Sequence, residues 1–224
     1  MQYYPAFLNL TDKRCLVVGA GGVGLRKATA LAACDPAEVL VVDPAPASGP
    51  WLDLPKKSPI VYAQRPFEDG DLDGRLLVFA ATDSAEVNDR VTALCSERGI
   101  LCNRAETPEK SDFFVPAHFS QDELTVAVST GGSSPALAKR LRRELKAWVG
   151  EQYGALVRVM ARLRPMVLDL GLDQEDNARI FRTMANSMLL DALGDEDLTM
   201  ADAILRQVLP QALHPRIPEV LDGM

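Results

Sequence analysis

RCLVVGAGGVG, residues 14–24, places Gly19, Gly21 and Gly24 in a G-x-G-x-x-G spacing directly after an apolar run. A strand that turns sharply into a helix uses this spacing. One glycine permits the turn, the second lets the backbone approach a pyrophosphate, and the third allows close helix–strand packing. The helix N-terminus then offers unpaired N–H groups and partial positive charge to phosphates. The segment therefore predicts a dinucleotide-binding fold that begins near the start of the chain.

The residues that follow fit such a fold. Val23–Ala33 is rich in alanine and leucine and predicts a helix, and Val39–Val42 predicts a second strand that ends in Asp43. An acid at that place hydrogen-bonds the adenosine ribose and repels a 2′-phosphate, so the pattern favours NAD over NADP. Asp43 and the following Pro44 are therefore both expected at the cofactor site. The alternative is that Asp43 is only a turn residue before Pro44.

Short β-rich runs alternate with helical patterns through the first half of the chain, which predicts βαβ units and a parallel sheet. The runs are Cys15–Val18, Val39–Val42, Ile60–Gln64, Leu76–Ala80 and Ile100–Asn103, with a helix over Ala85–Arg98 and a sixth β run at Leu124–Ser129. Ser134 as N-cap and Pro135 as first helical residue predict a helix to about Val149. Three further helices are expected over Gln152–Leu170, Gln174–Leu193 and Thr199–Leu213.

Composition narrows the class of protein. The formal net charge of −7 over 224 residues argues against general nucleic-acid binding, and no apolar run is long enough to span a membrane. Met1–Leu10 lacks the pattern of a signal peptide, so we expect a cytoplasmic protein. Four cysteines without paired spacing are expected to be reduced core thiols.

No metal site is expected. Asp69–Gly74 resembles the first half of a calcium loop, but its twelfth position is Ala80 where a bidentate glutamate is required. The two histidines, His118 and His214, lie far apart in the sequence and do not form a zinc motif.

Four segments together resemble the N-terminal module of siroheme synthases and their stand-alone relatives, the precorrin-2 dehydrogenases. They are YPAFLNLTDKRCLVVGAGGVGLRKA at residues 4–28, AATDSAEVNDRV at 80–91, CNRAETPEKSDFFVPA at 102–117 and LTVAVSTGGSSPALAKRLRREL at 124–145. The resemblance covers nearly all of the first 150 residues and is most specific in the last segment. Because the chain ends without a methyltransferase domain, we expect the stand-alone form.

The resemblance implies an α/β fold with three parts. These are a Rossmann-like NAD-binding domain over 1–113, a small central dimerisation region over 114–150 and an all-helical domain over 151–224. It also implies a homodimer that oxidises precorrin-2 to sirohydrochlorin with NAD. Two alternatives stay open: a bifunctional enzyme that also inserts iron, and a non-catalytic NAD-sensing module.

Further cofactor residues follow from the same resemblance. Gly21, Gly22 and Val23 match the cofactor turn of the family. Ala81 and Thr82, at the end of the fourth strand, are expected along the dinucleotide, because open α/β sheets bind ligands at that edge. Asn103, at the end of the fifth strand, is expected near the nicotinamide. Asp83 and Ser84 either share this site or only cap the following helix.

The expected catalytic acid is Glu106. Family members carry Asp in an N-x-x-D pattern, whereas this chain has Asn103-Arg104-Ala105-Glu106. Glutamate keeps the carboxylate and adds one methylene, and general-base catalysis depends on heavy-atom reach of about 3 Å. Glu106 is therefore expected to accept the proton lost from the macrocycle, with a plain loop acid as the alternative.

The expected substrate residues are those of the Ser/Thr-Gly loop, Ser129–Ser134, with one residue before it and one after it. Precorrin-2 is a polycarboxylate, so its pocket needs N–H groups, hydroxyls and cations. The residues that offer these are Ser129, Thr130, Gly131, Gly132, Ser133, Ser134, His118 and Arg140. Arg140 belongs to a run of four cations with Lys139, Arg142 and Arg143, for which a solvated face paired with acids such as Glu144 is the alternative.

Overall fold

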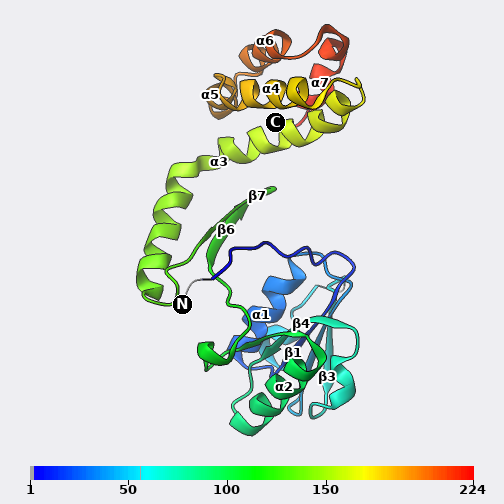
Figure 1. The fold of residues 1–224 in the computed structure, drawn as a ribbon, viewed down its shortest axis with the longest axis vertical. Helices are drawn as coiled ribbons and strands as arrows, with labels where there is room; N and C mark the ends of the chain where they lie inside the picture. Colours follow the sequence, from blue (N-terminus) through cyan, green and yellow to red (C-terminus); the bar gives the residue numbers. More distant parts are fainter. Residues whose placement is uncertain (1–2, 56) are drawn as a thin grey trace. The chain divides into compact units, whose positions relative to one another are not determined.

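The computed structural model describes residues 3–55 and 57–224, which divide into two compact units. The first unit is Tyr3–Val115 and the second is Pro116–Met224. Figure 1 shows the parallel sheet of the first unit and the hairpin and helices of the second. Each unit has a hydrophobic core of its own.

A five-stranded parallel sheet with the order β3-β2-β1-β4-β5 forms the centre of the first unit. The strands are β1 (Arg14–Val18), β2 (Glu38–Asp43), β3 (Ile60–Gln64), β4 (Arg75–Ala80) and β5 (Leu101–Arg104). Helices α1 (Gly22–Ala32) and α2 (Ala85–Arg98) join β1 to β2 and β4 to β5, with short 3-10 segments at η1 (Gly49–Trp51), η2 (Asp69–Leu72) and η3 (Pro108–Lys110). The α/β fold expected from the sequence is confirmed.

The inner strands β1, β2 and β4 are mostly apolar because both faces of the sheet are covered. Successive side chains of a strand point to opposite faces, so one apolar run supplies two cores. Leu16 and Val18 of β1 pack in the same cluster as Val91 and Cys95 of α2, whereas Val17 packs in the cluster that contains Ala28 of α1. Burial of this sheet therefore requires a helix on each face.

The second unit begins with an antiparallel hairpin of β6 (Ala117–Gln121) and β7 (Leu124–Val128). The strand expected at Leu124–Ser129 exists, but it pairs with β6, which the sequence reading missed. Phe119 of β6 is buried, and the residues on either side of it are exposed. A strand with a single buried side chain gives a weak alternation signal.

One long helix, α3 (Pro135–Leu168), follows the hairpin. Its N-terminus confirms the expected cap, because the Ser134 hydroxyl accepts a hydrogen bond from the Leu137 N–H and Pro135 is the first helical residue. Gly150 interrupts the helix with φ +62° and ψ 171°. The two helices expected on either side of residue 150 are therefore the two halves of α3.

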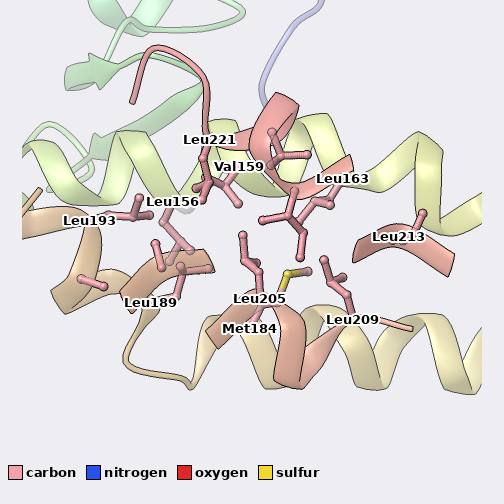
Figure 2. Close-up of a cluster of buried hydrophobic side chains, with 14 of the residues drawn as sticks. Leu156, Val159, Leu163, Met184, Leu189, Leu193, Leu205, Leu209, Leu213 and Leu221 are labelled. Carbon is pink, nitrogen blue, oxygen red and sulfur yellow. The ribbon is translucent and has the colours of Figure 1, made fainter. Parts of the chain in front are cut away.

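The remaining helices pack against the second half of α3. They are α4 (Gln174–Ala185), α5 (Leu189–Gly194), α6 (Leu198–Val208), η4 (Gln211–Arg216) and α7 (Ile217–Leu221). Figure 2 shows the core that they share, in which Val159 and Leu163 of α3 meet Met184, Leu189 and Leu205.

Two of the expected tail helices are shorter than the sequence suggested. The helix expected over Gln174–Leu193 is broken between α4 and α5, where Asn186 donates to the Arg182 carbonyl and Ser187 to that of Met184. The helix expected to reach Leu213 ends at Val208, because Pro210 cannot continue it. Over the residues that the structure describes, no helix combines the length and apolarity needed to cross a membrane.

Candidate cofactor and catalytic site

A cleft of about 280 Å³ lies at the carboxyl ends of β1, β2 and β4. It is lined by Val18, Gly19, Gly21, Val42, Asp43, Pro44, Pro66, Phe67, Ala81, Thr82, Asp83, Ser84 and Val87. In the sheet, β2 lies on one side of β1 and β4 lies on the other, so the strand order reverses at β1. Open α/β sheets bind ligands in the crevice at such a point, outside the carboxyl ends of the strands. Six of the expected cofactor residues thus line one cleft: Gly19, Gly21, Asp43, Pro44, Ala81 and Thr82.

Two of the loop glycines are required by packing. Gly19 has φ +103°, and a Cβ there would lie 2.5 Å from the carbonyl oxygen of Ala81. A Cβ on Gly24 would lie 1.9 Å from the carbonyl oxygen of Gly19. Gly19 therefore allows the turn, and Gly24 allows α1 to approach the end of β1.

The space around the other two glycines of the loop, Gly21 and Gly22, is open. A Cβ on Gly21 or Gly22 would meet no atom within 4 Å, and no acidic residue lies in the first turn of α1. Gly21 is the N-cap and provides no side-chain cap, so N–H groups of the first turn lack intrahelical acceptors. An uncapped helix end with open space in front of it suits a phosphate group. The turn therefore fits the pyrophosphate of a dinucleotide.

Asp43, at the end of β2, connects the cleft to the glycine turn. Its Oδ2 accepts a hydrogen bond from the Ala20 N–H at 2.7 Å, and its Oδ1 accepts one from the Ala45 N–H at 2.8 Å. Each carboxylate oxygen keeps a lone pair for a ribose hydroxyl. Burial and then the Asp43 carboxylate raise the pKa of Tyr62, whose hydroxyl donates to the Ala45 carbonyl at 2.9 Å. Asp43 thus joins the end of β2 to the glycine turn and to the residues after β2.

The nearby cation Arg65 is already paired. It directly precedes Pro66 and Phe67 of the cleft, and both oxygens of Asp71 accept hydrogen bonds from its guanidinium, at 2.8 and 2.6 Å. A 2′-phosphate would need a free cation close to Asp43. This arrangement fits an unphosphorylated ribose.

The Ala81-Thr82 turn is held by Asn88, a fully buried residue of α2. The Asn88 Oδ1 accepts from the Thr82 N–H at 3.2 Å and from the Thr82 hydroxyl at 2.8 Å, and its Nδ2 donates to the Thr82 carbonyl at 2.8 Å. Ser84 caps α2 by accepting from the Val87 N–H, as one sequence alternative held, and it also lines the cleft. The wall of the cleft that Ala81 and Thr82 form is therefore fixed by side-chain hydrogen bonds.

The end of β5 lies beside β4 but does not line the cleft. Asn103 is buried, and its Nδ2 donates to the Phe113 carbonyl at 2.7 Å, so its Oδ1 and its second Nδ2 hydrogen remain for a ligand. The Ala105 N–H donates to the Ala80 carbonyl at 3.0 Å, which fixes the residue before Glu106 against the end of β4. Glu106 itself is exposed.

The expected substrate loop belongs to the second unit. Within it, the Thr130 hydroxyl donates to the Ser134 carbonyl and accepts from the Ser134 N–H, both at 3.1 Å. The Gly131 N–H donates to the Ser129 hydroxyl at 3.0 Å, and Gly132 has φ +86°. The hydroxyls of Ser129, Thr130 and Ser134 therefore shape this turn at the start of α3.

His118 and Arg140 are both exposed in the second unit. The His118 Nδ1 lies 3.0 Å from the Pro116 carbonyl oxygen. The Arg140 Nε donates to the Glu144 carboxylate at 2.7 Å, and this hydrogen bond raises the pKa of Arg140. Arg140 therefore has an acidic partner on the helix surface in this structure.

The carboxylates of Asp69–Gly74 bind arginines. Asp69 pairs with Arg90, and Asp73 with Arg98. Over the described residues, no group of three or more His, Cys, Asp or Glu side chains lies close enough to hold a metal ion. Of the four cysteines, all of which are free thiols, Cys34 is exposed, contrary to the expectation that all lie in the core.

Sequence reasoning missed several residues that line or support the cleft. Asn88 supports it through Thr82, and the Trp51 Nε1 supports it by donating to the Ala20 carbonyl at 2.8 Å. Phe67 and Val87 add apolar lining. The one available signal was that Asn88 is a polar residue on the apolar face of its helix, three and seven residues before the buried Val91 and Cys95.

Comparisons with known proteins agree with this geometry. Residues 6–117 match the family model described as "Putative NAD(P)-binding", and residues 121–147 match the model described as "Sirohaem biosynthesis protein central". The siroheme synthase of Thioalkalivibrio sulfidiphilus (strain HL-EbGR7) is 42% identical over 216 residues, which is 96% of this chain and 42% of that protein. Siroheme synthase 2 of Pectobacterium atrosepticum is 33% identical over 224 residues, 100% of this chain and 48% of that protein.

The chain thus spans less than half the length of these curated relatives. A solved structure named "SirC, precorrin-2 dehydrogenase" is similar to it with a TM-score of 0.73 and 22% sequence identity. That match covers 92% of this chain and 98% of the other. At this identity it shows a shared fold.

Proposed function

We propose that this chain, which belongs to the NAD(P)-binding family, oxidises precorrin-2 to sirohydrochlorin with NAD as hydride acceptor. The observation that carries the proposal is the uncapped glycine turn, open at Gly21 and Gly22, beside the ribose-binding geometry of Asp43. The similarity to two siroheme synthases, and to a structure named as a precorrin-2 dehydrogenase, supports this choice of substrate.

The chain's own groups would hold the cofactor along the cleft. The N–H groups of Gly22 and Val23 are suited to the pyrophosphate, and Asp43 with Pro44 to the adenosine ribose. Ala81 and Thr82 are suited to the length of the dinucleotide, and the free Oδ1 of Asn103 to the nicotinamide amide. When bound, NAD supplies a two-electron acceptor. NAD rather than NADP is supported by the charge of Asp43 and by the pairing of Arg65 with Asp71.

Oxidation of precorrin-2 removes two hydrogens. One leaves as hydride to the nicotinamide, and the other leaves as a proton that needs an acceptor. We assign that acceptor to Glu106, which follows the fixed Ala105–Ala80 contact at the carboxyl edge of the sheet. The extra methylene of glutamate lets its carboxylate lie farther from this edge than an aspartate would.

We infer a separate function for each of three regions of the chain. Residues 1–113 bind NAD, residues 114–150 form the dimerisation region, and residues 151–224 form the helical domain. The hydroxyls and N–H groups of Ser129–Ser134, with His118 and Arg140, receive the carboxylates of precorrin-2. The working form is a homodimer. A cytoplasmic location agrees with four free thiols.

An anaerobic assay tests the proposal. Precorrin-2 and NAD are mixed with the protein, and NADH and sirohydrochlorin are followed by absorbance. We expect equal amounts of both products, with NADP giving slower turnover. Glu106→Ala should lower kcat by on the order of 10²-fold, within the range attributed to general-base catalysis. If no NADH forms, the proposed dehydrogenase activity is wrong. If Glu106→Ala turns over within a factor of two of wild type, the proposed role of Glu106 as proton acceptor is wrong.

The same assay decides between the alternatives. Ferrous or cobalt ions are added after sirohydrochlorin has formed, and the spectrum of the metallated macrocycle is followed. Metal insertion by wild type above the uncatalysed rate supports the bifunctional enzyme. NAD binding without turnover of precorrin-2 supports the sensing module.

A further inference from the structure

Asp89 of α2 is an acid whose carboxylate binds two cations from another part of the first unit. Its Oδ1 accepts hydrogen bonds from the Arg104 guanidinium and from the Lys110 ammonium, the latter at 3.1 Å. Arg104 ends β5 and Lys110 ends η3, so the two cations flank the segment that carries Glu106. One carboxylate therefore holds both ends of residues 104–110 against α2.

The Arg104 side chain depends on this contact. It is only 6% exposed, and its Nε has no hydrogen-bond partner among the residues that the structure describes. A buried guanidinium without a counter-charge is strongly unfavourable. Asp89 is half exposed, but it supplies the carboxylate that pairs with Arg104. Loss of the Asp89 charge should therefore displace Arg104 and the residues attached to it.

The start of this segment is also bound to the residue that follows its end, through the Ser111 hydroxyl. The Arg104 N–H donates to the Ser111 hydroxyl at 2.9 Å, and that hydroxyl lies 3.3 Å from the Arg104 carbonyl oxygen. The Ala105 N–H donates to Ala80, the residue before the Ala81-Thr82 wall of the cleft. Glu106 thus leaves the sheet edge beside the cleft, in a short loop with both ends held.

Hydrogen bonds from Lys110 and Arg104 lower the pKa of Asp89. The carboxylate therefore stays ionised, and the pairing persists, throughout the neutral range in which an NAD-dependent oxidation would run. Neither cation has another carboxylate partner among the described residues.

We propose that Asp89 is a positioning residue for Glu106, which it holds at its working distance through Arg104 and Lys110. This inference rests on the proposed function, in which Glu106 accepts the proton from precorrin-2. Proton transfer needs donor and acceptor heavy atoms within about 3 Å. A displacement of about 1 Å can lower a rate by on the order of 10²-fold.

The test compares Asp89→Asn with wild type and with Asp69→Asn. Asp69 pairs with Arg90, also on α2, but has no contact with residues 104–110, so Asp69→Asn should keep the wild-type kcat. Asp89→Asn keeps the shape of the side chain and removes its charge. We expect Asp89→Asn to lower kcat for precorrin-2 about tenfold and to leave the dissociation constant for NAD unchanged. We also expect it to shift the acidic limb of the plot of kcat against pH. Asp89→Glu should restore part of the loss.

A double-mutant cycle with Glu106→Ala separates positioning from general stabilisation. If Asp89 acts through Glu106, adding Asp89→Asn to Glu106→Ala lowers kcat no further. A further tenfold loss in the double variant, or wild-type kcat in Asp89→Asn, would overturn the inference while Glu106 kept its role. If Glu106→Ala alone has wild-type kcat, both the role of Glu106 and that of Asp89 are wrong.

Lys110→Met provides a milder perturbation if Asp89→Asn does not fold. Lys110 is exposed, and its removal leaves the Arg104–Asp89 pair in place. We expect a smaller loss of kcat, of about two- to threefold, which is also absent in the Glu106→Ala background. An unchanged kcat in Lys110→Met would remove Lys110 from the arrangement.

Discussion

Gly22 and Gly24 offer a matched pair of alanine substitutions that separates packing from ligand binding. Both residues lie in the first turn of α1. A Cβ on Gly24 would lie 1.9 Å from the Gly19 carbonyl oxygen, whereas a Cβ on Gly22 would meet nothing within 4 Å. The obstructing atom at Gly24 is a backbone oxygen, so no side-chain rotation relieves the clash. The helix must move by about 1 Å relative to the loop.

The size of the effect follows from two terms. Replacing a helical glycine with alanine stabilises by about 0.5–1 kcal/mol, and both variants receive this gain. Overpacking costs about 1–3 kcal/mol, and only Gly24→Ala incurs it. The two variants should therefore differ by about 2 kcal/mol in the free energy of unfolding, with Gly22→Ala the more stable. For a unit of roughly 110 residues this corresponds to about 8 °C in Tm.

Chemical and thermal unfolding of the two variants can be followed by tryptophan emission. Trp51 is buried in the first unit and Trp148 is exposed, so the change in emission on unfolding reports mainly the first unit. NAD binding is measured in parallel by calorimetry. Gly22→Ala should bind on the order of tenfold more weakly despite its higher stability, because its methyl group occupies the space for the pyrophosphate. Equal Tm values for the two variants would refute the packing argument.

Three other substitutions test separate features. Asp43→Ser should reduce the preference for NAD over NADP, read from the ratio of their kcat/KM values; an unchanged ratio would remove Asp43 from the ribose site. Asn88→Leu should cost about 2–3 kcal/mol in denaturant unfolding and weaken NAD binding, because it removes the hydrogen-bond partner of the Thr82 N–H and of the Thr82 carbonyl, both partly buried. Burial tends to raise the pKa of Asp71, but hydrogen bonds from Arg65 and the Glu68 N–H outweigh this and lower it. Its contribution to stability is therefore present above about pH 4 and lost as pH falls through the depressed pKa. Asp71→Asn should be less stable than wild type at pH 7, and the gap between them should narrow in acid; a gap that stays constant with pH would contradict this.

The sheet could be predicted because local sequence and tertiary burial agree there. Strand β3, expected at Ile60–Gln64, has those bounds, and the other four strands end within one residue of expectation. The strands β1, β2 and β4 contain short apolar runs that are buried on both faces, so the pattern survives without knowledge of the neighbours. The edge strand β3 is only partly buried, but its Ile60, Val61 and Tyr62 have high β-propensity. Strand β6 fails this condition, because Phe119 is its one buried side chain.

The site could be predicted only where backbone geometry decides it. The need for Gly19 and Gly24 follows from the strand–turn–helix itself and could be inferred from spacing. The bonding of Asn88 to Thr82 and of Asn103 to Phe113 depends on segments brought together by the fold, and the amide side chains give no local sign of their partners. The same reason hid the pairing of Asp89 with Arg104.

The two hydrogen bonds that Asp43 accepts from Ala20 and Ala45 also bear on how cofactor preference could change over evolutionary time. A descendant that used a 2′-phosphorylated dinucleotide would have to lose this acid, and with it an acceptor that orders the phosphate turn. The first mutation on that route would impair the use of both dinucleotides before a second mutation, supplying a cation, could favour either. On the preference for NAD that we propose, a change of cofactor would therefore need at least two substitutions, one that removes Asp43 and one that supplies a cation.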